Sequence, residues 1–180
     1  LLKPHAASQL VKALKQTVDT PIHFHNHDTS GAGVASLIQA ISQGCDIVDG
    51  AVSSMSGLTS QPSLNAVVAS LDHETTKKTI SLRHLDHLSN FWAKARQMYM
   101  CFDPGLKSTS TDVYYHEIPG GQYSNLFHQA ASVGLSADEF NALTQRYKEV
   151  NDLFGDIIKV TPSSKVVGDM ALLLQKSKIT

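Results

Sequence analysis

The sequence predicts an α/β protein in which two parallel βα units are followed by a mainly helical half. Three histidines alternate in a short stretch at residues 21–31, and a second short apolar strand is expected at residues 46–52. A helix-length segment separates the two strands, and a connection of that length requires a parallel sheet. After residue 80 the apolar residues recur at helical spacing instead.

The first strand is expected over residues 21–27, with His23, His25 and His27 on one face and Phe24 on the other. Neutral imidazole is the commonest metal ligand, and two imidazoles two residues apart on one strand face can reach one ion. At most two of the three can bind directly, because neighbours on a strand diverge along its axis. The alternative, that these histidines are structural and hydrogen-bonded, stays open at this point.

Polar residues at 28–30 are expected to cap the helix that follows the first strand. The loop at residues 53–63 is rich in hydroxyl groups and lies at the same end of the sheet as the histidines, so a functional role is favoured over a plain connector. Ser136 and Glu139 have the spacing of a capping box. Helices are expected at residues 5–18, 31–43, 64–70, 82–102, 122–133 and 136–154, with a last helix ending near residue 176.

The composition is that of a globular protein, with 42% hydrophobic residues among 180. The net charge of −1 gives no indication of a nucleic-acid partner. No apolar run approaches the ~20 residues that cross a bilayer, so no membrane partner is expected. Cys45 and Cys101 lack the spacing of a metal or redox motif and are interpreted as buried free thiols in a reducing compartment.

Two parallel strands do not make a stable sheet. Partner chains or residues upstream of Leu1 are therefore expected to complete it, and a beginning in the middle of an element favours a chain truncated at its N-terminus.

Four stretches of the sequence are candidate motifs: residues 25–33 (HNHDTSGAG), 54–63 (SMSGLTSQPS), 117–123 (EIPGGQY) and 159–165 (KVTPSSK). In this order they resemble motifs of one known family, the pyruvate carboxylases, and specifically of their biotin-dependent carboxyltransferase domain. The resemblance covers essentially the whole chain.

The resemblance implies a (β/α)8 TIM barrel followed by a helical funnel. Residues 1–75 would be the last βα units of the barrel and residues 76–180 the funnel. It also implies an Mn²⁺ or Zn²⁺ ion held by His25 and His27, together with an Asp and a carbamylated Lys that this chain lacks. His23 departs from the metal role.

The resemblance further implies that CO2 is transferred from carboxybiotin to pyruvate, giving oxaloacetate. Thr161 would move a proton between biotin and pyruvate, and Ser164 and Lys165 would line the biotin pocket. On local pattern alone, residues 161–164 read as the cap of the last helix. The implied partners are a biotin carboxyl carrier domain, an ATP-using domain elsewhere in the enzyme, and further copies in a homo-tetramer, in the bacterial cytoplasm or the mitochondrial matrix.

Two other interpretations remain. One is a sister enzyme, the carboxyltransferase subunit of an oxaloacetate decarboxylase or a transcarboxylase, which shares the last two motifs. The other is a non-catalytic helical interaction module with structural histidines. The 180 residues alone are expected to be inactive.

Overall fold

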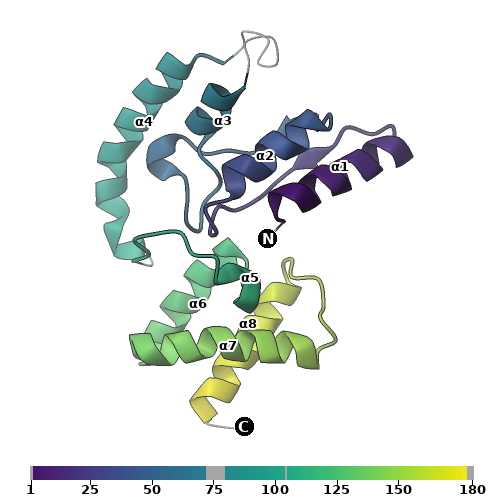
Figure 1. Cartoon of the computed structure of the whole chain (residues 1–180). Helices are drawn as coiled ribbons and strands as arrows, with labels where there is room; N and C mark the ends of the chain where they lie inside the picture. The colour runs from purple at the N-terminus through teal and green to yellow at the C-terminus, as the bar shows by residue number, and fades with distance from the viewer. Residues whose placement is uncertain (1, 72–79, 104, 178–180) are drawn as a thin grey trace. The chain divides into compact units, whose positions relative to one another are not determined.

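The computed structural model describes residues 2–71, 80–103 and 105–177, and it divides into two compact units, Leu1–Ser110 and Thr111–Thr180 (Figure 1). Each unit is described by itself below. The domain boundary expected between residues 75 and 76 lies outside the described residues.

Unit 1 contains a two-stranded parallel sheet and helices that precede, connect and follow its strands (Figure 1). Its elements in chain order are α1 (Pro4–Thr17), β1 (His23–Phe24), α2 (Gly33–Ser42), β2 (Ile47–Val48), the 3₁₀ helix η1 (Ser53–Met55), α3 (Leu64–Ser70), α4 (Leu82–Arg96) and the 3₁₀ helix η2 (Gln97–Phe102).

Both strands are shorter than the sequence predicts. Only two residues of each strand pair, with His23 opposite Ile47 and Phe24 opposite Val48. One more hydrogen bond, from Asp49 N–H to the carbonyl of Phe24, ends the ladder. Beyond it the chain turns to the 53–63 loop, since Asp28 N–H donates to the carbonyl of Ser60. The parallel order was predicted correctly, and the strand ends at 27 and 52 were wrong.

Helix α2 begins two residues later than predicted. Gly31, with φ +79°, makes a turn that only glycine adopts without strain, and the helix starts at Gly33. The predicted cap is present in a modified form, because Asp28 Oδ1 accepts a hydrogen bond of 2.7 Å from Gly33 N–H. A Cβ atom at residue 33 would lie 2.6 Å from both Asp28 Oδ1 and Pro62 Cγ, so this close approach requires glycine.

The core of unit 1 lies between α1, α2, β1 and α3, and its buried members are Ala7, Val11, Phe24, Leu37, Ala40 and Val67. The expected apolar stripe at 82–102 is largely outside that core. α4 ends at Arg96, and of the stripe only Leu85 is buried, while Trp92 is 40% and Phe102 68% exposed. The described elements that α4 packs against are α3, η1 and η2, which do not cover this face. Cys101 is likewise exposed rather than buried, and Cys45 is half-buried.

Over residues 111–177, unit 2 is a bundle of four helices: α5 (Val113–His116), α6 (Gly120–Ser132), α7 (Ala137–Leu153) and α8 (Ser163–Ser177). The predicted capping box is present at the start of α7, where Ser136 Oγ accepts from Glu139 N–H and the Glu139 carboxylate accepts from Ser136 N–H. Gly120 and Gly121 form the first turn of α6 rather than preceding it. The buried core residues are Ile118, Leu126, Ala130, Phe140, Leu143, Tyr147, Val150, Val167 and Ala171.

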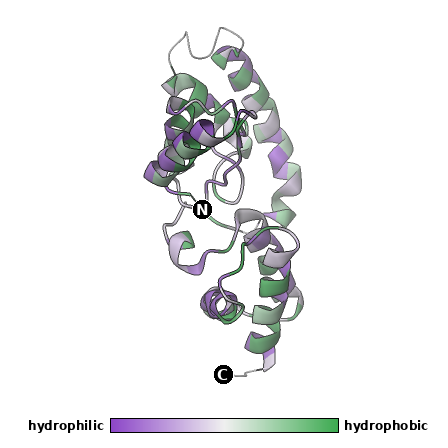
Figure 2. Cartoon of the chain, turned by 90° about the vertical axis from the view of Figure 1, so that its right-hand side faces the viewer, coloured by the Kyte–Doolittle hydropathy of each residue, from purple (hydrophilic) through white to green (hydrophobic). Residues whose placement is uncertain are grey.

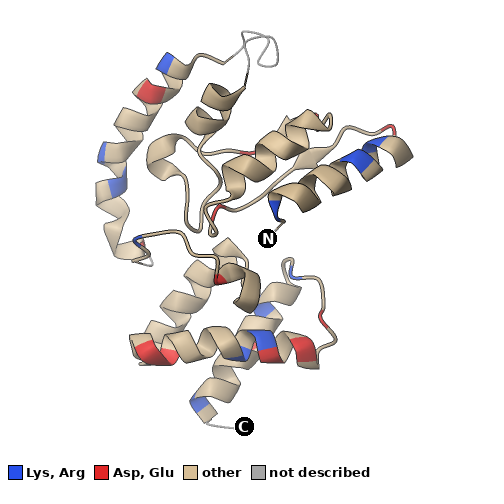
Figure 3. Cartoon of the chain, viewed as in Figure 1, with Lys and Arg blue, Asp and Glu red and all other residues tan. Residues whose placement is uncertain are grey.

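The helices of both units carry hydrophobic and hydrophilic residues along their length (Figure 2). Acidic and basic residues are interspersed, and α7 carries both signs (Figure 3). Within the described ranges, no helix is at once long enough and apolar enough to cross a membrane.

Candidate functional site

The imidazoles of His25 and His27 converge at the end of β1. Their Nε2 atoms are 3.4 Å apart, and the ring planes are nearly perpendicular at 80°. Two metal–nitrogen bonds of ~2.1 Å that meet at a tetrahedral angle also place their nitrogens about 3.4 Å apart. The separation therefore matches that of two ligands on one ion.

The other ring nitrogen of each histidine is already engaged. His27 Nδ1 lies 2.6 Å from the carbonyl oxygen of Thr59, which can only accept, so His27 Nδ1 carries the proton. His25 Nδ1 lies 2.7 Å from Asp49 Oδ2. A neutral imidazole with its proton on Nδ1 presents a lone pair at Nε2, so both lone pairs point into the same space. Ligating histidines commonly have such a carbonyl or carboxylate partner.

Asp49 joins the first and second histidines. Its Oδ1 lies 2.8 Å from His23 Nε2, while its Oδ2 meets His25. The hydrogen bond from His23, and then that from His25, hold the pKa of the Asp49 carboxyl below its usual range. The ionised carboxylate therefore accepts both bonds. His23 lies on the same side of the strand but turns to Asp49, away from the space between His25 and His27.

Burial changes the pKa of His27, the second histidine of the site. It lowers this pKa, and the hydrogen bond to Thr59 only partly opposes that effect. Burial also raises the pKa of Asp28, opposed by the hydrogen bond from Gly33 N–H. His27 is therefore held neutral, as a metal ligand must be.

The loop after β2 places the Thr59 carbonyl. Gly57 and Leu58 both have positive φ, +81° and +54°, and Gly57 N–H donates to the carbonyl of Gln61 at 2.8 Å. Leucine in this conformation is strained, and strain of this kind persists only where the surrounding structure enforces it. The hydroxyl-rich loop thus contributes to the histidine site through its backbone.

The same loop lines a cavity of 270 Å³ together with the end of α4 and η2. Arg96 lies at its wall, and its two terminal nitrogens donate to the Ser54 carbonyl at 2.9 Å and to Asp103 Oδ2 at 3.1 Å. The guanidinium therefore ties the loop to η2. The lining residues are Met55, Ser56, Gly57, Leu58, Thr59, Ser60, Arg96, Tyr99, Met100, Phe102 and Asp103.

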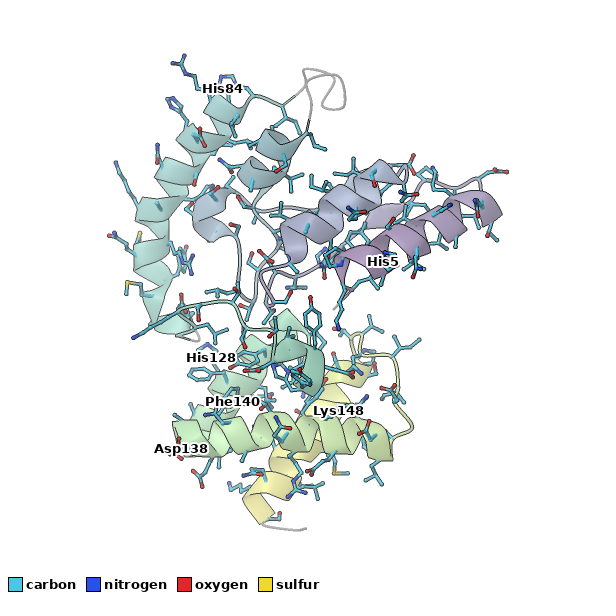
Figure 4. The ribbon with its side chains drawn as sticks, viewed as in Figure 1. His5, His84, His128, Asp138, Phe140 and Lys148 are labelled. Atoms are coloured by element: carbon cyan, nitrogen blue, oxygen red, sulfur yellow. The ribbon has the colours of Figure 1, made fainter. Side chains whose placement is uncertain are left out.

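Two imidazoles do not complete a metal site. Across residues 2–71, 80–103 and 105–177, no cluster of three or more His, Cys, Asp or Glu side chains has a geometry suited to a metal ion. His5, His84 and His128 lie on the helices α1, α4 and α6 (Figure 4). The described residues thus supply two nitrogen donors with a fixed direction, and further ligands would have to come from other residues.

The three predicted biotin-site residues lie in unit 2, at the start of α8. Thr161 and Lys165 are exposed, and Ser164 is buried with 5% exposure. Lys165 pairs with Asp169 at 2.5 Å. The Thr161–Pro162 peptide bond is cis.

Ser163, the first residue of α8, makes side-chain hydrogen bonds within the turn that precedes the helix. Ser163 Oγ donates to the carbonyl of Val160 at 2.5 Å and accepts from Val160 N–H at 3.2 Å. Tyr147 OH donates to the Ser164 carbonyl at 3.3 Å. These hydrogen bonds hold Ser163 and Ser164 in place, whereas Thr161 lies at the surface of unit 2.

Sequence reasoning missed Asp49 and the carbonyl of Thr59. A signal for Asp49 was present, because an acid directly after the second parallel strand lies at the same sheet edge as residues that end the first. No side-chain pattern could have identified Thr59, since it acts through its backbone.

Comparison with known proteins agrees with this architecture. The model of the HMGL-like family matches residues 1–91, and the model described as a conserved carboxylase domain matches residues 113–180. The chain is 50% identical over its whole length to pyruvate carboxylase of Bacillus subtilis and spans 16% of that protein. It is 46% identical to the mitochondrial pyruvate carboxylase of Mus musculus, of which it spans 15%.

Solved structures give the same result. The carboxyl transferase domain of Rhizobium etli pyruvate carboxylase with oxamate and biotin superposes with a TM-score of 0.94 at 44% identity. The match covers 100% of this chain and 30% of that one. The same domain with pyruvate gives a TM-score of 0.93.

Proposed function

This chain belongs to the pyruvate carboxylase family, within its carboxyltransferase domain, and from that premise we propose that it contributes to the transfer of CO2 from carboxybiotin to pyruvate. The product is oxaloacetate. The single observation that supports this most strongly is the convergence of His25 and His27, with Nε2 atoms 3.4 Å apart and both Nδ1 atoms engaged elsewhere.

We propose His25 and His27 as ligands of an Mn²⁺ or Zn²⁺ ion. The fixed tautomers support this role, because each ring offers its Nε2 lone pair without rearrangement. Bound there, the ion would supply positive charge near the substrate and favour the enolate form of pyruvate. His23 is assigned a supporting role, because its Nε2 faces Asp49.

We propose that the Thr161 hydroxyl accepts a proton from the methyl carbon of pyruvate and donates one to the ureido nitrogen of biotin. The carbon that loses the proton forms the new bond to CO2, and the nitrogen that loses CO2 gains the proton, so the exchange balances. A hydroxyl suits this relay when both partners are within hydrogen-bond reach. Ser164 and Lys165 are proposed to position the biotin ring.

The proposal implies partners beyond this chain. Biotin would arrive on a carrier domain, after carboxylation with ATP in another domain of the enzyme. We further propose a homo-oligomeric enzyme, a tetramer by resemblance, located in the bacterial cytoplasm or the mitochondrial matrix. Light scattering of the full-length polypeptide measures the oligomeric state, and fractionation of the source cells measures the location.

The metal assignment is tested by replacing each histidine in the full-length polypeptide and measuring bound metal by elemental analysis. His25→Ala and His27→Ala should each lose most of the metal, whereas His23→Ala should retain most of it. The His23 variant is the matched control, since it removes the same ring from the same strand.

Equal metal loss in all three variants would contradict the assignment, because metal binding would then depend on an intact strand and not on the rings of His25 and His27. Full retention in His25→Ala and His27→Ala would contradict it as well.

A further inference from the structure

The turn at residues 160–165 is tied to a distant part of unit 2 by one ion pair. Lys159 Nζ lies 2.8 Å from Glu117 Oε2, 42 residues away in the chain. The Lys159 side chain is 16% exposed, which makes it the least exposed cation among the ion pairs of the described ranges. The pair joins two of the sequence motifs, and the mechanism above uses neither residue.

The backbone of Glu117 has a conformation that must be enforced. Its φ of +58° is left-handed, which disfavours a residue with a side chain. Its N–H donates to the carbonyl of Val113 at 2.9 Å, and the next residue, Ile118, is fully buried. Ile118 N–H in turn donates to His116 Nδ1 at 3.0 Å. These contacts hold the Glu117 backbone in this conformation, from which its carboxylate reaches Lys159.

The segment 117–123 also lies close to α8, the helix that follows the turn. A Cβ atom at Gly168 would lie 2.5 Å from Gln122 Nε2, so the first turn of α6 closely approaches the second turn of α8. Burial raises the pKa of Tyr147, and the negative charge of Glu117 adds to that effect. Tyr147 therefore keeps its proton and donates it to the Ser164 carbonyl.

We propose that Glu117 is a positioning residue, whose carboxylate acts through Lys159 to hold the 160–165 turn so that the Thr161 hydroxyl faces the biotin ring. This inference rests on the proposed function. It also explains why both segments are needed. The segment 117–123 supplies the anchoring carboxylate, and the segment 159–165 carries the reacting hydroxyl.

Lys159 has a second carboxylate neighbour, which offers a matched control. Asp156 Oδ1 lies 3.3 Å from Lys159 Nζ, and the Asp156 side chain is 70% exposed. Asp156 also has a positive φ, +52°, and accepts from Asn151 Nδ2 at 2.6 Å. Asp156→Asn removes one negative charge from Lys159 while keeping a residue type that tolerates this backbone.

The test measures the reverse reaction in the full-length polypeptide. Oxaloacetate loses CO2 to added free biotin, and pyruvate is formed. Glu117→Gln should lower kcat/KM for biotin about 10- to 100-fold, the scale of a misplacement near 1 Å. Lys159→Met should match it, and Lys159→Arg should recover most of the loss. Asp156→Asn, and Glu149→Gln at the remote Arg146–Glu149 pair, should have little effect.

ATP-dependent carboxylation of biotin should be unchanged in every variant. An unchanged kcat/KM in Glu117→Gln would overturn the proposal. If Glu117→Gln does not fold, or loses the ATP-dependent step as well, the Lys159 variants decide: equal activity in Lys159→Met and Lys159→Arg would overturn the proposal.

Thr161→Ala in parallel separates this inference from the function on which it rests. Full transfer activity in Thr161→Ala would refute the proposed role of Thr161 itself. Loss of transfer in Thr161→Ala with normal Glu117→Gln would refute only the positioning role.

Discussion

The two candidate sites are built in different ways. His25 and His27 are directed by single polar contacts, to Asp49 and to the Thr59 carbonyl, at the end of a strand of two residues. The 160–165 turn also has polar contacts, to Glu117 through Lys159 and from Tyr147 OH to the Ser164 carbonyl, but Tyr147 itself belongs to the buried core of unit 2. Among the described residues that core has nine buried members, against six in the larger unit 1.

The difference teaches that geometry can be stored either in polar contacts or in packing. A polar contact can be removed by one substitution with little loss of fold. A packed core resists local change, but its loss affects everything that rests on it.

The largest effect is expected in the core of unit 2. Leu143→Ala removes a fully buried side chain and should lower the free energy of unfolding by about 2–5 kcal/mol. Leu37→Ala, equally buried in unit 1, should cost less, because the smaller core around it can collapse more readily. Urea denaturation of the two variants measures the loss in free energy of unfolding. A larger loss in Leu37→Ala than in Leu143→Ala would contradict the expected difference between the two cores.

In the histidine site, the loss should appear in metal binding and not in stability. Asp49→Ala removes the partner of His25 and should weaken metal affinity about 10- to 100-fold, the usual effect of losing such a partner. His23→Ala removes only the other hydrogen bond to Asp49 and should cost less. Titration with Mn²⁺ or Zn²⁺ gives both values. Equal affinities of wild type and Asp49→Ala would show that the carboxylate does not orient the ring.

Helix caps allow a finer comparison. Ser136→Ala breaks the reciprocal capping box of α7 and should cost about 1 kcal/mol. Ser63→Ala breaks a one-way cap at α3, in which Ser63 Oγ accepts from Ala66 N–H at 3.3 Å, together with an exposed hydrogen bond to Ser53 Oγ, and should cost less. Thermal unfolding of both variants measures the order. The reverse order would contradict the greater contribution of the reciprocal cap.

The smallest effect is a pH dependence in unit 2. Burial lowers the pKa of His116, and the charges of Asp112 and Glu117 oppose this only in part. The unfolded chain therefore binds the proton more readily than the folded one. The stabilisation is fully present above the unfolded pKa, about 6.5, and is lost as the pH falls through the lower folded pKa.

His116→Asn should flatten this dependence, because its amide oxygen can still accept from Ile118 N–H without binding a proton. Urea unfolding at about pH 7.5 and about pH 5.5 tests the sign. A wild type that becomes more stable at the lower pH, relative to the variant, would reverse it.

Local patterns predicted the helices well, because apolar spacing and the Ser136–Glu139 box are local in sequence. They failed at the strand ends and on α4, since both depend on which elements pack alongside. Leu88, on the predicted core stripe, is 50% exposed. Spacing alone could not decide this.

In the candidate sites, too, features that are local in sequence were predictable and tertiary contacts were not. The alternation of His25 and His27 indicated two donors on one face, and their meeting at 3.4 Å agrees with it. The residues that direct them come from β2 and from the loop backbone, so tertiary structure was needed to find them. The Glu117–Lys159 pair spans 42 residues, and no periodic pattern links its members.

The most direct test of the proposed proton relay is the rate of carboxyl transfer in Thr161→Ala, measured in the full-length polypeptide beside Thr161→Ser. Thr161→Ala should lower the transfer rate by ~10²-fold or more, the scale of a lost acid–base group. Thr161→Ser should keep part of the rate, and ATP-driven carboxylation of biotin should be unchanged. Normal transfer in Thr161→Ala, with only a lower melting temperature, would contradict the proton-relay role and leave Thr161 with a structural one.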